Sequence, residues 1–125
     1  MDTAYLEIGD LLLAAERILG HPPLIRDRGL LESAVHRPQS TWFGQDVYPD
    51  LDQKAAALLL SLVGNHSLLD SNERLGWVGV RVFYSLNGHE LHAPRAEARE
   101  LIFAIAAGEV ADVAKVAEAL HLWRT

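Results

Sequence analysis

The chain has 125 residues, of which 50% are hydrophobic, a formal net charge of −6 and no cysteine. This composition predicts one folded domain spanning residues 1–125 and excludes a disulfide scaffold, thiol catalysis and cysteine-based zinc sites, while the acidic balance argues against direct nucleic-acid binding. The first residues are acidic where a secretion signal would be basic, and the longest apolar run, residues 55–64, is too short for a bilayer, so we expect a cytoplasmic protein with no membrane contact.

The first predicted element is an amphipathic helix over residues 3–19. Its apolar residues recur at helical spacing, Thr3 is a candidate N-cap and Gly20 a candidate C-terminal stop. The paired prolines and the glycine of residues 21–29 predict an irregular connector. A short helix follows and ends at Arg37, because the proline after it disfavours the α conformation of the preceding residue.

Residues 38–50 show no helical period and predict a loop or a small β-hairpin. This segment contains the aromatic residues Trp42, Phe43 and Tyr48, which either fill the core or contact a partner. Because large aromatic side chains in small domains are mostly buried, we expect the core placement.

The remaining chain predicts helices. Asp50 can cap a helix over residues 51–65, which is apolar on nearly all sides and is therefore predicted to be the central, buried helix. Further helices are predicted at about 72–86, 94–107 and 109–123. The fold class that follows is all-α, a compact bundle of about six helices with one short flap loop or hairpin.

Polar residues gather at the break after the central helix. A loop that leads into a helix offers unpaired backbone N–H groups, from about Ser71 to Arg74, and the positive end of the helix dipole to an anion. Asn72 can add an amide donor and Arg74 a bidentate phosphate contact, and Asp70 suits a magnesium ion that bridges phosphates. Histidine exchanges protons near neutral pH, so His66 can take a proton from an attacking hydroxyl. These groups together are the parts of phosphoryl or nucleotidyl transfer.

A purely structural interpretation of the same residues is also open. Asp70, Ser71 and Asn72 are all good N-cap residues, and a helix start needs no function to explain them. His66 and Arg74 can equally be solvated surface residues. The spacing alone does not choose between the two interpretations.

The segment HSLLDSNER, residues 66–74, resembles the active-site motif of the Fic superfamily, and in particular of its Doc (death-on-curing) toxin branch, whose pattern is H-x-F-x-D-A/G-N-K-R. The resemblance continues in the same order through IRDRGLLESAVHRPQ (25–39), KAAALLLSLVGNH (54–66) and FYSLNGHEL (83–91). It therefore covers most of residues 25–91, which is far more specific than a short motif.

The resemblance implies an all-α Fic fold, a single Fic/Doc-type domain, and the use of ATP and Mg²⁺ to modify a hydroxyl of a protein target. It implies His66 as the catalytic base, Asp70 as the metal ligand, and Ser71, Asn72 and Arg74 as the nucleotide- and phosphate-binding residues. The loop 40–47 would be the flap that docks the target, and its central residues are Thr41, Trp42, Phe43, Gly44 and Gln45.

The resemblance also implies partners. Members of the Doc branch move the γ-phosphate of ATP onto elongation factor Tu and block translation, and they pair with a cognate, Phd-like antitoxin. The sequence contains no S/T-x-x-x-E-G/N stretch, the internal inhibitory motif of self-restrained Fic proteins. We therefore expect the inhibitor to be a separate chain that docks a helical segment into a groove of the N-terminal half.

Glu73 is the main departure from the family pattern, because it stands where Doc proteins carry lysine and typical Fic proteins carry glycine. An inward carboxylate would repel phosphate, whereas an outward one is a favourable acid in the first helical turn. In the family, glycine accompanies AMP transfer and lysine accompanies γ-phosphate transfer. The surrounding Doc-like sequence favours a kinase-type phosphotransferase; AMP transfer, or a catalytically disabled binding or co-repressor module, are the alternatives.

Overall fold

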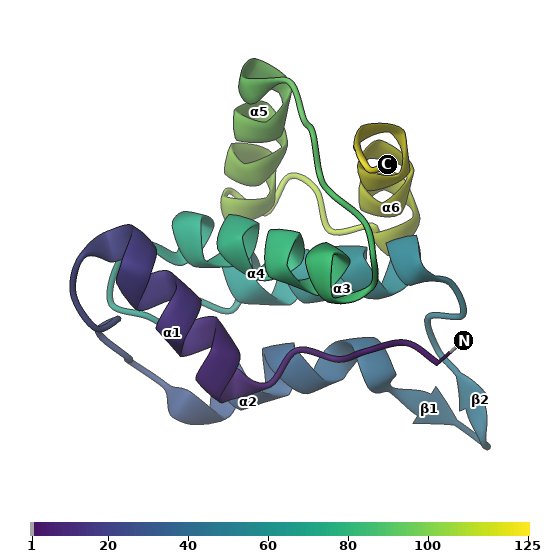
Figure 1. The fold of residues 1–125 in the computed structure, drawn as a ribbon, viewed down its shortest axis with the longest axis horizontal. Helices are drawn as coiled ribbons and strands as arrows, with labels where there is room; N and C mark the ends of the chain where they lie inside the picture. Colours follow the sequence, from purple (N-terminus) through teal and green to yellow (C-terminus); the bar gives the residue numbers. More distant parts are fainter. Residues whose placement is uncertain (1) are drawn as a thin grey trace.

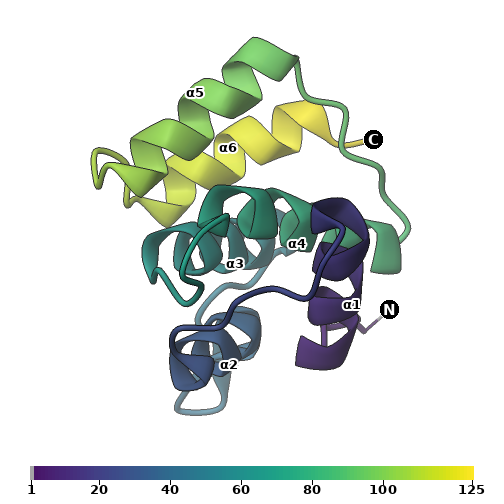
Figure 2. The same cartoon turned by 90° about the vertical axis from the view of Figure 1, so that its left-hand side faces the viewer.

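The computed structural model describes residues 2–125, and within them the chain forms six α-helices and one two-stranded antiparallel hairpin (Figure 1). The elements in chain order are α1 (Ile8–Leu19), α2 (Arg28–His36), the 3-10 turn η1 (Arg37–Gln39), β1 (Thr41–Trp42), β2 (Gln45–Asp46), α3 (Leu51–Gly64), α4 (Asn72–Leu86), α5 (Arg95–Ala106) and α6 (Val113–Trp123). The paired helices α3 and α4 form a middle layer, with α1 and α2 on one side and α5 and α6 on the other (Figure 2). The predicted all-α bundle with a small hairpin is confirmed. No helix among the described residues combines the length and apolarity that a membrane span requires.

Helix α3 is the centre of the core, as its sequence predicted. Every residue from Lys54 to Val63 is buried, and the helix packs against α2, α4, α5 and α6. Asp50 caps its start, since its carboxylate accepts the Gln53 N–H at 2.8 Å. Helix α4 approaches α3 closely at Gly76 and Gly79, where an added methyl group would meet α3 side chains.

Helix α1 begins at Ile8, so the predicted start at Thr3 is wrong. The side chain of Asn87, at the end of α4, accepts the Ala4 N–H at 2.8 Å and donates to the Ala4 carbonyl at 2.9 Å. The Ala4 carbonyl, which a longer helix would use as an acceptor in its first turn, is thus bonded to Asn87, and residues 3–7 are not helical. The predicted stop is confirmed: Gly20 has φ 80° and its N–H bonds to the Glu16 carbonyl.

The hairpin is present, but its aromatic tip is not in the core. The two turn residues, Phe43 and Gly44, have φ values of 49° and 77°, the left-handed pair that a tight hairpin requires. Trp42 is 70% and Phe43 88% exposed, and their rings pack edge to face on each other. The predicted core placement is wrong for both, because strands of two residues place the turn beyond the helical layers. Tyr48 is half-buried at the base of the hairpin, where its hydroxyl accepts Arg37 Nε at 2.9 Å.

A buried lysine fixes the base of the hairpin to α3. Lys54 is 2% exposed, and its ammonium group donates to the Tyr48 carbonyl and to the Asp46 carboxylate, the latter at 3.2 Å. A buried charge requires such partners, so Lys54 and the hairpin base stabilise each other. The hairpin is therefore a projection with a fixed base and an exposed tip.

Candidate active site

The candidate site is the loop of residues 65–71, which leaves the end of α3 and enters α4. Two of its residues adopt the left-handed conformation that favours glycine: His66 has φ 51° and Ser71 φ 64°. Each such residue costs about 1–2 kcal/mol, so the surrounding structure must hold the loop in place.

The connector before α2 lies along this loop and binds its backbone. The Leu69 N–H donates to the Leu24 carbonyl at 2.9 Å, and the N–H groups of Arg26 and Asp27 both donate to the Ser67 carbonyl, at 2.8 Å and 3.0 Å. The loop that carries His66 is thus one strand of a short antiparallel contact. The connector was predicted as irregular, and its contact with the loop carries no local sequence signal.

Asn72 shapes the loop from its other end. Its buried carboxamide accepts the Leu68 N–H at 2.9 Å and donates to the Leu68 carbonyl at 3.1 Å. The side chain expected to contact phosphate is therefore turned toward the loop backbone. Direct contact between Asn72 and a nucleotide stays a prediction. The backbone N–H of Asn72, in the first turn of α4, is better suited to that contact than its side chain.

Side-chain capping does not account for the polar residues of the loop. Ser71 occupies the N-cap position in a left-handed conformation and its side chain makes no capping bond. Within residues 2–125, the backbone N–H groups of Asn72, Glu73 and Arg74 have no hydrogen-bond acceptor. The start of α4 therefore presents unpaired donors and the positive end of a helix dipole, which together suit an anion.

The remaining predicted site residues surround this helix start. His66, Asp70, Glu73 and Arg74 are exposed, and none forms an ion pair with another described residue. One loop and one helical turn thus bring together a histidine, a carboxylate, a guanidinium and free N–H donors. An exposed Glu73 is an ordinary and favourable acid for a first turn.

The hairpin does not meet this loop. It precedes the start of α3, whereas His66 follows the end of that helix, and Figure 1 shows the two at opposite ends of α3. The 14 residues of α3 span about 21 Å at 1.5 Å per residue. The flap residues Thr41, Trp42, Phe43, Gly44 and Gln45 are all exposed, and target docking by them stays a prediction. A target that contacts both regions must therefore span a comparable distance over the surface.

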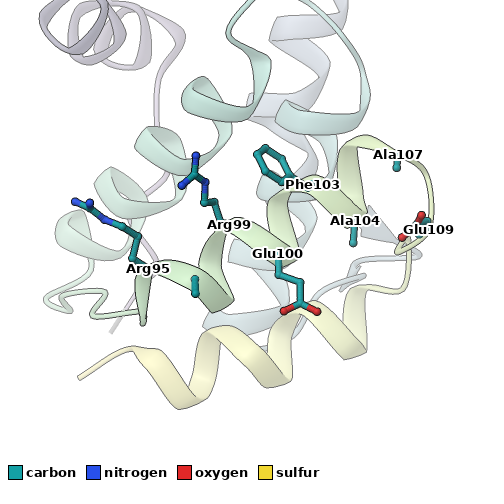
Figure 3. Close-up of a pocket in the computed structure, with 8 residues that line it drawn as sticks. Arg95, Arg99, Glu100, Phe103, Ala104, Ala107 and Glu109 are labelled. Atoms are coloured by element: carbon teal, nitrogen blue, oxygen red, sulfur yellow. The ribbon is translucent and has the colours of Figure 1, made fainter.

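A wide surface hollow lies away from the candidate site. Its volume is about 830 Å³, and it follows the outer face of α5, where the Arg99 guanidinium lies 5.9 Å from the centre of the Phe103 ring (Figure 3). Arg95 and Arg99 line it together with Glu100 and Glu109, so its charge is mixed. No residue of the 66–74 motif lines this hollow.

A smaller hollow of about 340 Å³ lies between α1 and the connector. Its lining is mostly apolar and consists of Gly9, Leu12, Leu13, Glu16, Pro22, Pro23 and Ile25. Ile25 forms an isolated antiparallel bridge with Leu68 of the motif loop. Ile25 therefore both lines the hollow and pairs with the loop of the candidate site.

A buried charge cluster was not predicted from the sequence. Asp52, in the first turn of α3, accepts Arg124 Nε at 2.7 Å and Nη2 at 3.1 Å, accepts the Tyr84 hydroxyl at 2.8 Å, and lies 2.7 Å from His121 Nδ1. Burial alone would raise the pKa of Asp52, but the hydrogen bonds from Arg124, Tyr84 and His121 outweigh it and lower that pKa. Burial and the bond to Asp52 raise the pKa of Tyr84 far above its usual range. The cluster joins α3, α4 and α6 at the end of α3 opposite the motif.

The protein is thus a small all-α domain in which the exposed His66, Asp70 and Arg74 and the buried Asn72 lie between the two central helices. The sequence model of the Fic/DOC family matches residues 3–84. Over 91 residues the chain is 47% identical to the protein named Toxin Doc of Mycolicibacterium smegmatis, an alignment that covers 73% of this chain and 70% of the relative. The chain belongs to the Fic/DOC family, as the motif predicted.

Proposed function

We propose that this chain is the toxin of a toxin–antitoxin pair, and that it transfers the γ-phosphate of ATP to a Ser or Thr hydroxyl of elongation factor Tu. The observation that carries the proposal is that one loop and one helical turn hold the motif residues His66, Asp70, Asn72 and Arg74 in a chain of the Fic/DOC family. The extensive identity to a protein named Toxin Doc supports the same class of activity.

The chain supplies the proton acceptor and the anion-binding groups for this reaction. The His66 ring is exposed and has no hydrogen-bond partner among residues 2–125, so it is free to take the proton of the target hydroxyl. The hydroxyl oxygen bonds to the γ-phosphorus while the bond from that phosphorus to the β-phosphate oxygen breaks, and ADP leaves with the electron pair. Arg74 and the free N–H groups of the first turn of α4 hold the phosphates.

The same loop fits a magnesium nucleotide. Asp70 is an exposed carboxylate two residues before the first turn of α4, and Arg74, four residues further on, is also exposed. Mg²⁺ binds through one or two carboxylates together with nucleotide phosphates and water, so a single carboxylate suffices for it here. When bound, the ion would neutralise charge on the phosphates.

Because Glu73 departs from the family pattern, the experiment also has to test two alternatives to γ-phosphate transfer. AMP transfer would attach the α-phosphate of ATP to the target hydroxyl while pyrophosphate leaves, and a disabled module would bind an antitoxin but no nucleotide. We expect purified protein to label elongation factor Tu from γ-labelled ATP and not from α-labelled ATP, and His66→Ala to lose this transfer. Label from the α position alone would establish AMP transfer. Failure of both labels, with no ATP binding by calorimetry, would support the disabled module.

We propose that a Phd-like antitoxin helix occupies the hollow between α1 and the connector, in the cytoplasm where translation takes place. Near it are the exposed leucines Leu13 (52%), Leu24 (51%) and Leu69 (66%), an apolar surface that suits the apolar face of a helix. Leu13→Asp should weaken antitoxin binding in calorimetry. The matched control is Leu122→Asp on α6, where the leucine is 77% exposed and distant from the hollow in sequence and layer. Equal binding by the two variants would refute this docking site.

A further inference from the structure

We propose that Arg26 is a positioning residue that holds His66 in its left-handed backbone conformation and so aims the histidine ring at the start of α4. The inference rests on the proposed role of His66 as the base. Arg26 lies outside the motif, in the connector before α2.

One residue binds the backbone of three successive loop positions. The Arg26 guanidinium donates from Nε to the His66 carbonyl at 2.7 Å and from Nη2 to the Asn65 carbonyl at 3.3 Å. The Arg26 backbone N–H donates to the Ser67 carbonyl at 2.8 Å. The peptide groups on both sides of His66 are therefore fixed by Arg26.

The bonds from Arg26 stabilise an unfavourable backbone conformation of His66. His66 has φ 51°, which residues with a side chain rarely adopt without help from their surroundings. Bonds from a guanidinium to carbonyl oxygens are charge-assisted, and its planar fork fixes two acceptors at once, which an ammonium group does not. Arg26 thus supplies geometry as well as charge.

The end of α3 favours a cation at this place. Asn65 is the C-cap of α3, and no basic residue stands in the last turn of that helix. The partial negative charge of the helix end is therefore met by a cation from the connector. The bonds from Arg26 therefore stabilise both the C-terminal end of α3 and the backbone of His66.

Nucleotide binding should not depend on Arg26. The start of α4 is held separately, because the carboxamide of Asn72 binds both backbone groups of Leu68. Loss of Arg26 should therefore move His66 and leave the first turn of α4 and Arg74 in place. The expected signature is a fall in kcat with little change in the KM for ATP.

The test compares Arg26→Gln and Arg26→Lys with Arg28→Gln. Arg28 is the matched control because it lies two residues further on, is exposed, and among residues 2–125 pairs only with Glu32, at 3.2 Å on the surface. We expect Arg26→Gln to lower kcat by between about 10-fold and 10²-fold, the effect of a small misplacement of a reacting group. Arg26→Lys should recover little of this loss, and Arg28→Gln should keep the activity of the parent chain.

A second measurement does not depend on the proposed reaction. The coupling constant between the His66 amide and α protons reports φ, and it should change in both Arg26 variants and not in Arg28→Gln. An unchanged coupling, or an unchanged kcat beside an inactive His66→Ala, would overturn the inference. If His66→Ala keeps full activity, the proposed function fails. A coupling constant that still changes in the Arg26 variants would then show that Arg26 only holds the loop backbone, and would overturn its link to catalysis.

Discussion

Asp52→Asn tests the buried charge cluster that joins α3, α4 and α6. The substitution keeps the size of the side chain and removes its charge. The parent residue is 8% exposed, and its carboxylate accepts two bonds from Arg124 and one from Tyr84. Asparagine can still accept from the tyrosine, but it leaves the guanidinium without its counter-charge.

The expected loss follows from these contacts. Removing one partner of a buried ion pair costs about 3–5 kcal/mol. Water reaches part of this cluster, since the side chain of Arg124 is 22% and that of His121 65% exposed. We therefore reduce the expected loss in the free energy of unfolding to about 2–4 kcal/mol at neutral pH.

The assay is urea denaturation of the parent chain and the variant over a range of pH. The pKa of Asp52 is lowered in the folded state by its hydrogen bonds. Its contribution is therefore present above the unfolded value of about 3.9 and is lost as the pH falls through the folded pKa. The difference between the two proteins should shrink below about pH 4.

Asp10→Asn, at the exposed start of α1, is the control, and it should cost less than about 1 kcal/mol. A loss below 1 kcal/mol for Asp52→Asn, or a difference that persists unchanged into acid, would refute this account of the cluster. Because Asp52 lies at the end of α3 opposite the motif, the folded variant should keep the activity of the parent.

Three further predictions concern packing, the hairpin and the site. Gly76→Ala should lower the free energy of unfolding in urea by about 1–3 kcal/mol, because the added methyl group meets α3. Gly9→Ala, with nothing within 4 Å of the added methyl group, should raise it by about 0.5–1 kcal/mol. A change of the same sign in both variants would contradict this prediction. Lys54→Met should free the base of the hairpin and speed hydrogen exchange of the Val47 amide, so an unchanged exchange rate would show that other contacts hold the hairpin. Glu73→Lys should leave ATP affinity almost unchanged in calorimetry, as expected for an outward carboxylate; a steep rise at low salt that fades at high salt would place it against the phosphates.

The elements that could be predicted from the sequence are those with local causes. The start of α3 at its cap Asp50 and the stop of α1 at the left-handed Gly20 follow from the residue type at each boundary. The start of α1 could not be predicted, because the bonds that end its possible extension come from Asn87, 83 residues away.

The candidate site likewise combines features that have local causes with features that depend on distant residues. Motif spacing predicts that His66 and Asp70 share one loop with the start of α4, because all of these residues are contiguous. The bonds of Arg26 to that loop cross about 40 residues, and the charge cluster around Asp52 joins residues up to 72 positions apart. Such contacts depend on how the helices pack, and no local pattern of residue types announces them.

The short motif therefore defines which groups are present, while elements outside it decide where they lie. Gly76 lets α4 approach the end of α3, and Arg26 fixes the peptide groups around His66. Each of these contacts acts on the backbone, so a substitution there changes the direction of a motif side chain without removing it. A family member that keeps His66 and Asp70 can for this reason gain or lose transfer activity through its connector. The identity of residue 26 should accordingly predict the rate of transfer, whereas that of residue 73, whose side chain is exposed, should have little effect on the affinity for the nucleotide.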